Sequence, residues 1–171
     1  MLYRFFSACL ILMGTLINAQ APINDNYPNA IDITSLIGSC SADAIYTNVN
    51  ASADMAEASC WNTGGVDPDY NVWFKFTAPA SGQIRATVDI GGTKGDARKI
   101  NAAIWDNDGT TELACNRYMN NDDDVDVSAL GLTPGQTYYI SVDTKDGGNR
   151  GSFTMCLSET LTFDYYEAAI D

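Results

Sequence analysis

The stretch Asn71-Val-Trp-Phe-Lys-Phe-Thr-Ala-Pro-Ala-Ser-Gly82 joins an alternating pattern to a run of turn residues. Successive side chains of a β-strand point to opposite sides, so Val72, Phe74 and Phe76 share one face of a strand. The Ala-Pro-Ala-Ser-Gly run that follows predicts a turn, because proline and glycine favour the backbone angles of turns. The whole stretch therefore predicts one strand of a β-sheet and the turn that leads into the next.

The same short alternation recurs along the chain, and no stretch after the first twenty residues keeps a helical period over three turns. The turn-forming runs Asp106–Gly109 and Asp146–Asn149 separate some of these segments. Further strands are predicted at 84–89, 100–105, 124–129, 138–143 and 153–157, with a weaker one at 44–49. Many short strands with regular turns predict an all-β fold, namely an antiparallel two-sheet β-sandwich of jelly-roll or Greek-key type.

The run Leu132-Thr-Pro-Gly-Gln-Thr-Tyr138 predicts a tyrosine corner. In that motif a Pro-Gly turn reverses the chain, and a buried tyrosine hydroxyl bonds to nearby backbone. The motif indicates a Greek-key sandwich and carries no information about activity.

The first nineteen residues are typical of a secretory signal peptide. Arg4 supplies the positive charge, and the apolar run from Cys9 to Ile17 is too short to span a bilayer comfortably. Cleavage is expected just after Ala19. We therefore assign residues 1–19 to the signal peptide, 20–158 to a β-sandwich module, and 159–171 to a linker and the start of a second module.

The second module is inferred from a short repeat. Residues 25–32 (DNYPNAID) align without gaps with residues 164–171 (DYYEAAID), and five of the eight positions are identical. The first copy opens the module and the second follows its last predicted strand. This placement predicts a tandem array, of which the chain holds one complete unit.

Four cysteines remain after the signal peptide: Cys40, Cys60, Cys115 and Cys156. An even number of cysteines in an exported chain predicts two disulfides, for which three pairings are possible. We favour Cys40–Cys60, which closes a local loop, and Cys115–Cys156, which ties two late strands. Zinc is the alternative, but the chain has no C-x-x-C pair and no histidine.

Composition excludes several functions. The net charge is −13 and becomes one unit more negative once Arg4 leaves with the signal peptide, whereas binding to nucleic acid needs clustered Lys and Arg. The absence of histidine removes Ser-His-Asp and Cys-His catalysis. Residues 122–126 supply carboxylates that a glycosidase could use, but a solvated acidic loop is the plainer interpretation. We expect no enzyme activity.

Calcium is the cofactor that the sequence allows, because acidic loops at the end of a sandwich can supply its six to eight oxygen ligands. The candidate ligands lie in two loops, and the alternative is that acidic turns keep an edge soluble. The candidates are Asp106, Asp108, Asp122, Asp123 and Asp124.

Several aromatic residues could stack on a sugar if they were exposed. Trp73 and Trp105 lie within strand patterns and are expected to fill the core, and Trp61 is expected to pack on the disulfide of Cys60. Tyr118 and Tyr139 are the candidates for an exposed ligand-binding surface.

Several segments in order resemble the sandwich modules of Bacteroidetes cell-surface proteins. The resemblance rests on 24–26, 30–33, 71–82, 112–115, 131–142 and 151–156. These modules are similar to bacterial pre-peptidase C-terminal domains, and the nearest resemblance is to the repeated modules of gliding-motility adhesins. The resemblance implies a jelly-roll-like sandwich, exported by Sec and, for the parent protein, by the type IX system.

These features together predict a non-catalytic extracellular module of a large cell-surface adhesin that serves gliding motility or attachment. The alternative is an accessory carbohydrate- or protein-binding domain of a secreted multidomain enzyme. Expected partners are neighbouring modules of the same chain and surface glycans or other surface proteins. Neither nucleic acid nor membrane insertion after signal cleavage is expected.

Overall fold

A computed structural model describes residues 20–61 and 70–159. The expected signal peptide at 1–19 and the expected second module, which begins at Asp164, lie outside these residues. Both assignments therefore stay predictions. No helix in the described part of the chain is long and apolar enough to cross a membrane.

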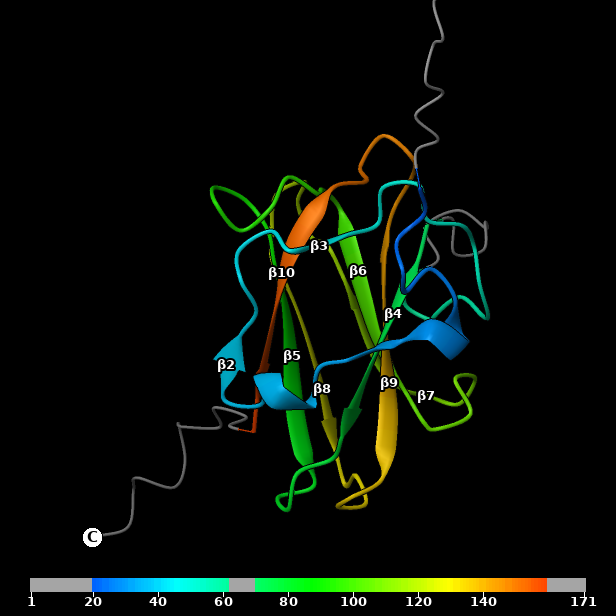
Figure 1. Ribbon diagram of the computed structural model, residues 1–171, viewed down its shortest axis with the longest axis vertical. Coiled ribbons are helices and arrows are strands. Elements are labelled where there is room, and N and C mark those ends of the chain that lie inside the picture. The colour runs from blue at the N-terminus through cyan, green and yellow to red at the C-terminus, as the bar shows by residue number, and fades with distance from the viewer. Residues whose placement is uncertain (1–19, 62–69, 160–171) are drawn as a thin grey trace, which may run out of the picture.

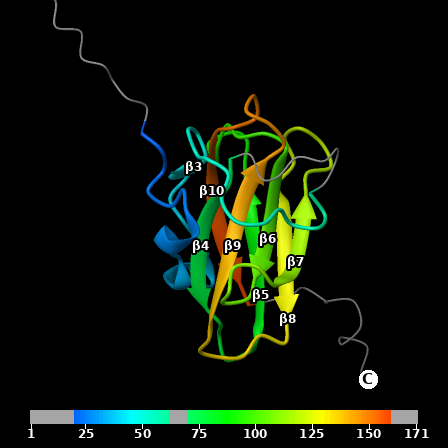
Figure 2. The same cartoon turned by 90° about the vertical axis from the view of Figure 1, so that its right-hand side faces the viewer.

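Two β-sheets pack face to face in the described residues (Figure 1). The first sheet has the order β1-β4-β9-β6-β7, with bounds Ile31–Asp32, Val72–Thr77, Thr137–Thr144, Ile100–Trp105 and Glu112–Arg117. The second has the order β3-β10-β5-β8, with bounds Tyr46–Thr47, Ser152–Ser158, Gln83–Asp89 and Val125–Leu130. Figure 2 shows β4 and β9 of the first sheet in front of β10 and β5 of the second.

Three short elements complete the fold: β2 (Ser39–Cys40) and the 3-10 helices η1 (Tyr27–Asn29) and η2 (Thr34–Leu36). Neighbouring strands of the two sheets are antiparallel except for β1, which runs parallel to β4. The prediction of an all-β, two-sheet sandwich is confirmed.

The inter-sheet core follows from the alternation in the sequence. Val72, Phe74 and Phe76 of β4 are fully buried, and they face the equally buried Ile84 and Val88 of β5 within one cluster. Burial of each large side chain contributes about 1.5–3 kcal/mol relative to exposure. The chain direction reverses between these strands at 78–82, as the turn residues predict.

A second apolar cluster lies on the outer face of the first sheet. Trp73 and Trp105 point there and not between the sheets, with their rings 6.2 Å apart. Residues from the N-terminal part of the chain cover them, namely Tyr27, Ala30, Ala58 and Trp61. The prediction that both tryptophans are buried is right. They are buried between the first sheet and the N-terminal residues that cover it, however, and not in the inter-sheet core.

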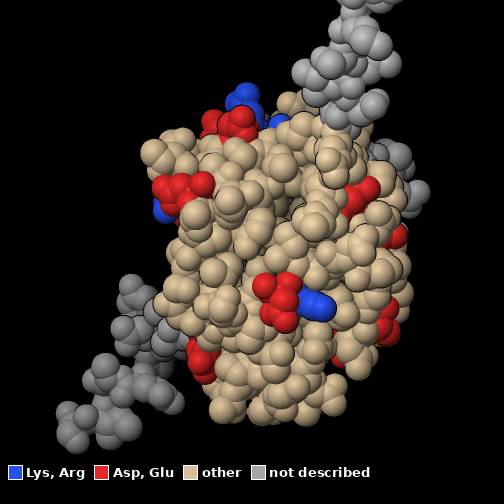
Figure 3. Space-filling model, viewed as in Figure 1, with Lys and Arg blue, Asp and Glu red and all other residues tan. Residues whose placement is uncertain are grey.

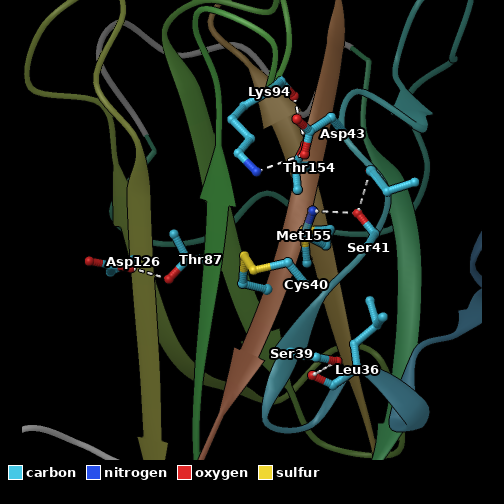
Figure 4. The surroundings of a disulfide bond; sticks show 12 residues. Leu36, Ser39, Cys40, Ser41, Asp43, Thr87, Lys94, Asp126, Thr154 and Met155 are labelled. Atoms are coloured by element: carbon cyan, nitrogen blue, oxygen red, sulfur yellow. Dashed lines mark hydrogen bonds and ion pairs between the residues drawn. A yellow bond between two sulfur atoms is a disulfide. The ribbon is translucent and has the colours of Figure 1, made fainter.

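The favoured disulfide pairing is wrong. The bridges are Cys40–Cys156 and Cys60–Cys115. β2 runs beside β10, since Ser41 donates its backbone N–H to the Met155 carbonyl at 2.8 Å, and this places Cys40 against Cys156 (Figure 4). Proximity in sequence favours Cys40–Cys60, but Cys60 lies on the opposite side of the sandwich, in the cover over the first sheet.

The second bridge belongs to that cover. Glu112, at the start of β7, accepts hydrogen bonds from the backbone N–H and hydroxyl of Ser59 at 2.5 and 2.7 Å. These bonds hold the covering segment against β7, where Cys115 lies beside Cys60. Trp61 belongs to the apolar cluster against which both cysteines pack.

Three connections meet at one end of the sandwich, which we call the loop end: β5–β6, β7–β8 and β9–β10. The register shows this directly, because the last residues of β7 and β9 pair with the first residues of β6. In the same way β10 and β8 begin beside the last residues of β5. The described chain begins near the loop end and finishes at the opposite end, as Figure 1 shows.

Candidate functional site

A row of polar residues crosses the first sheet at the loop end. Asp143 of β9 pairs in register with Asn101 of β6, and Asn101 pairs with Arg117 of β7. Because side chains of paired residues share a face, this row lies on the outer side of the sheet. It continues the face that carries Trp73 and Trp105, but with polar side chains in their place.

Two residues of this row are deeply buried. The Asp143 carboxylate, 3% exposed, accepts hydrogen bonds from the backbone N–H groups of Tyr70 and Thr144 at 3.1 and 2.7 Å. Asn101 is 4% exposed, and its Oδ1 has no hydrogen-bond partner among the residues that the structure describes.

Sequence reasoning missed Asn101. The only signal is that one amide interrupts the otherwise apolar run Ile100–Trp105. Asn71, which precedes β4, exchanges two hydrogen bonds with the backbone of Asp54 at 2.8 and 2.9 Å and so anchors the cover.

Basic residues gather at the loop end although acidic residues dominate the chain. Figure 3 shows scattered acidic groups and few basic ones on the face drawn there. Of the eight Lys and Arg residues in the described part of the chain, six lie in or next to the three connections of the loop end. They are Lys94, Arg98, Lys99, Arg117, Lys145 and Arg150.

Two of these six form ion pairs: Lys94 with Asp43 at 2.7 Å and Arg98 with Asp122 at 2.9 Å. Arg150 lies over the ring of Tyr70, 4.4 Å from its centre. Lys99, Arg117 and Lys145 form no ion pair with any residue that the structure describes.

The proposed calcium ligands of residues 122–124 are held separately. Asp122 pairs with Arg98, Asp123 accepts two bonds from Asn120 at 2.8 and 2.9 Å, and Asp124 accepts the Ile90 N–H at 2.7 Å. Burial, and then the neighbouring Asp124 carboxyl, raise the pKa of Asp89 at the end of β5. Each carboxylate of this loop therefore has its own local partner.

The other candidate ligands lie at the far end of β7. Asp106 and Asp108 belong to the β6–β7 hairpin at the start of that strand, whereas residues 122–124 follow its end. Hydrogen bonds from Thr111 and Thr110 hold the pKa of Asp108 well below its usual range. One ion cannot be shared by the two loops, and no group of three or more His, Cys, Asp or Glu residues gathers for a metal within 20–61 and 70–159. Calcium binding at either loop stays a prediction.

Tyr118 and Tyr139 are also apart. Tyr118 follows β7 at the loop end and is half-buried. Tyr139 lies near the start of β9, where its ring is 4.4 Å from that of Tyr27 at the rim of the cover. They do not form one stacking platform, and Tyr118 is the one that adjoins the basic residues.

The fold and this loop end define a class: a two-sheet β-sandwich whose polar residues and connections collect at one end, as in binding modules. Residues 23–155 match the model of a family described as galactose binding domain-like and associated with the type IX secretion system. The chain belongs to that family. No curated protein matches it. Domains of this family are binding modules, generally non-catalytic, and together with the two disulfides the match indicates an extracellular or surface protein.

Proposed function

We propose that the chain is a non-catalytic module of a large cell-surface adhesin that serves attachment or gliding motility, and that it works under tension. The family match supports a binding or surface module outside the cell. The observation that carries the adhesin proposal is the Cys40–Cys156 bridge, which spans 116 positions of the chain.

The bridge determines how a pulling force crosses the module. The chain enters near the loop end and leaves at the other end, so tension between neighbouring parts of a surface protein acts along the long axis (Figure 1). The force passes from the N-terminal segment through Cys40 to Cys156 and out through the last residues of β10. Everything between the two cysteines lies outside this path.

The size of the protected loop makes the effect large. An extended chain spans at most about 3.3–3.6 Å per residue, so the 116-position separation hides roughly 400 Å of extension. The Cys60–Cys115 bridge lies wholly inside this loop and adds nothing to the path. A domain that only binds a soluble ligand has no need of such protection, whereas a stalk under shear does.

Single-molecule force spectroscopy on the secreted protein, pulled from its two ends, tests the proposal. Under oxidising conditions we expect only the segments outside the bridge to extend. Reduction should release about 400 Å more, whereas the oxidised Cys40→Ser/Cys156→Ser double variant should release roughly 200 Å, because the Cys60–Cys115 bridge then still closes 55 positions of the chain. The matched control is Cys60→Ser/Cys115→Ser, which should extend like the oxidised wild type.

The outcome against the proposal is full extension of the oxidised protein. A second arm tests the biology, since cells that carry the Cys40→Ser/Cys156→Ser protein should detach at lower shear than cells that carry the control variant. Equal detachment would show that the bridge has no part in attachment.

The family description also favours a second candidate, an accessory carbohydrate-binding domain of a secreted multidomain enzyme. The reading frame beyond Asp171 separates the two. Further copies of the module support the adhesin, and a catalytic domain supports the accessory role.

A further inference from the structure

We propose that the outer edge of β4 is a binding site for a short peptide segment, and that residues 164–171 of one chain bind it in a second copy of the chain. There they replace that copy's own residues 25–32, whose sequence they repeat. We call this surface the β4-edge site; it consists of β4 with Ser52, Asn107 and Tyr139. Such an exchange links copies whether or not the module bears tension, so it goes beyond the proposed function.

The N-terminal segment completes the hydrogen bonding of β4. β9 lies along one side of β4, and on the other side β1 provides only two paired residues (Figure 2). Residues on either side of β1 extend the contact. Trp73 donates its N–H to the Asn24 carbonyl at 2.9 Å, and Ile33 donates its own to the carbonyl of Lys75 at 2.8 Å. A sheet edge that only a short terminal segment covers can pair with another extended segment instead.

Two side chains fix the first half of the segment. The buried Asp25 carboxylate accepts hydrogen bonds from the backbone N–H and the hydroxyl of Ser52 at 2.6 and 2.9 Å. The ring of Tyr27 lies edge-on to that of Trp73, with 5.3 Å between their centres. The Tyr27 hydroxyl donates to the Asn107 carbonyl at 2.6 Å. These contacts select an aspartate and, two positions later, a tyrosine.

The second half of the segment presents one small, one apolar and one acidic side chain. Ala30 is buried in the apolar cluster on the outer face of the first sheet, and Ile31 packs against the inter-sheet core. Asp32 pairs in register with Lys75, so opposite charges lie on neighbouring strands. The β4-edge site therefore contacts a complete pattern, Asp-x-Tyr-x-x-Ala-Ile-Asp.

The repeat keeps the residues that make these contacts and changes the others. The five identical positions are the five just described, and four of them are buried or half-buried. The three positions that differ are all exposed, namely Asn26, Pro28 and Asn29. A chance match has no reason to separate contacting positions from exposed ones. Residues 164–171 therefore carry the whole set of side chains that the site contacts.

Competition with the resident segment determines when the exchange occurs. Residues 25–32 belong to the same chain as the site, so they act at an effective concentration on the order of millimolar. An incoming copy offers the same side chains, and it binds where the protein is crowded or where the resident segment is weakened. The receiving chain can give its own residues 164–171 to a third copy. The contact is therefore head-to-tail and builds linear chains.

Sedimentation velocity on the oxidised protein, over a series of concentrations, tests the exchange. Tyr27→Ala weakens the resident segment and should tighten self-association at least tenfold relative to the wild type. Adding Tyr166→Ala removes the corresponding ring from the incoming segment and should return the protein to a monomer. The matched control adds Tyr165→Ala instead, at the position of the exposed Asn26, and should leave the association unchanged.

A peptide gives a second readout. If Tyr27→Ala does not fold, Tyr27→Phe takes its place, because it loses only the hydrogen bond to Asn107. A labelled peptide of residues 160–171 should bind the folded Tyr27 variant more tightly than the wild type, as measured by fluorescence anisotropy. The same peptide with Tyr166→Ala should bind at least tenfold more weakly, and with Tyr165→Ala it should bind equally well.

Association that survives Tyr166→Ala would come from the uncovered aromatic residues and would overturn the assignment. Equal effects of Tyr165→Ala and Tyr166→Ala would overturn it as well. A Tyr27 variant that stays monomeric and does not bind the peptide excludes the β4-edge site as the receptor of residues 164–171. None of these results bears on the force experiment, which decides the proposed function separately.

Discussion

The hydroxyl of Tyr138 accepts a hydrogen bond of 2.9 Å from the backbone N–H of Thr133, five residues earlier. Its ring lies 6.0 Å from that of Phe76, the residue opposite it on β4. The bond satisfies an amide in the turn that precedes β9, and the ring fills the core below that turn. This is the tyrosine corner that the Leu132–Tyr138 run predicts.

Tyr138→Phe should lower the free energy of unfolding by about 1 kcal/mol, because the Thr133 amide loses its partner while the ring stays in place. Urea denaturation followed by fluorescence measures the change. Tyr46→Phe is the control, since the Tyr46 hydroxyl makes no hydrogen bond with a described residue and its ring packs on Phe74. Equal effects of the two variants would contradict a special role for the corner.

Alanine substitutions at Gly82 and Gly135 distinguish the cost of backbone strain from the cost of a steric clash. Both have positive φ, +64° and +81°. A β-carbon on Gly82 would lie 2.7 Å from the Leu132 carbonyl oxygen, whereas one on Gly135 would meet no atom within 4 Å. Gly135→Ala should cost on the order of 1–2 kcal/mol through strain alone. Gly82→Ala should cost clearly more, and equal losses of stability would refute the contact.

Proteolysis without reduction, followed by mass spectrometry, should recover peptides that join Cys40 to Cys156 and Cys60 to Cys115. Loss of either bridge through a double Cys→Ser variant should cost about 2–5 kcal/mol, because each closes a long loop in the unfolded chain. Recovery of a Cys40–Cys60 peptide would show that the local pairing forms after all.

Tyr27 makes the module sensitive to alkali. Burial first, and then the hydrogen bond and charge of Tyr139, raise the pKa of Tyr27 from 10.0 to about 12. The folded state holds this proton more tightly than the unfolded state. Its contribution is therefore complete below pH 10 and is lost as pH rises toward 12. Tyr27→Phe should flatten the fall in stability over this window, measured by thermal melting at each pH, and an unchanged slope would count against it.

The sequence predicts the central strands well because their faces differ so strongly. Ile84, Ala86 and Val88 of β5 alternate with polar neighbours, so a single pattern predicts both the strand and its buried side. β7 was missed as a strand because it lies at the edge of its sheet and its residues are half-buried or exposed on both faces. Such a strand leaves no alternation to detect.

The position of the covering segment and the pairing of the disulfides could not be predicted from the sequence for a different reason. Cys40 meets Cys156 only because β2 lies beside β10, and that neighbourhood depends on the order of strands in the second sheet. Asn101 and Lys99 depend on register in the same way. A pattern of polar and apolar residues gives the face of a strand, but not which strand stands next to it.

The Cys40–Cys156 bridge also sets an order of events in time. During synthesis Cys40 emerges long before its partner, which follows 116 positions later and only two residues before β10 ends. The Cys40–Cys156 disulfide cannot form in a partial chain, because β10 must first pair beside β2. A chain that stops before β10 lacks the native partner of Cys40, so this bridge forms only after the last strand has been made.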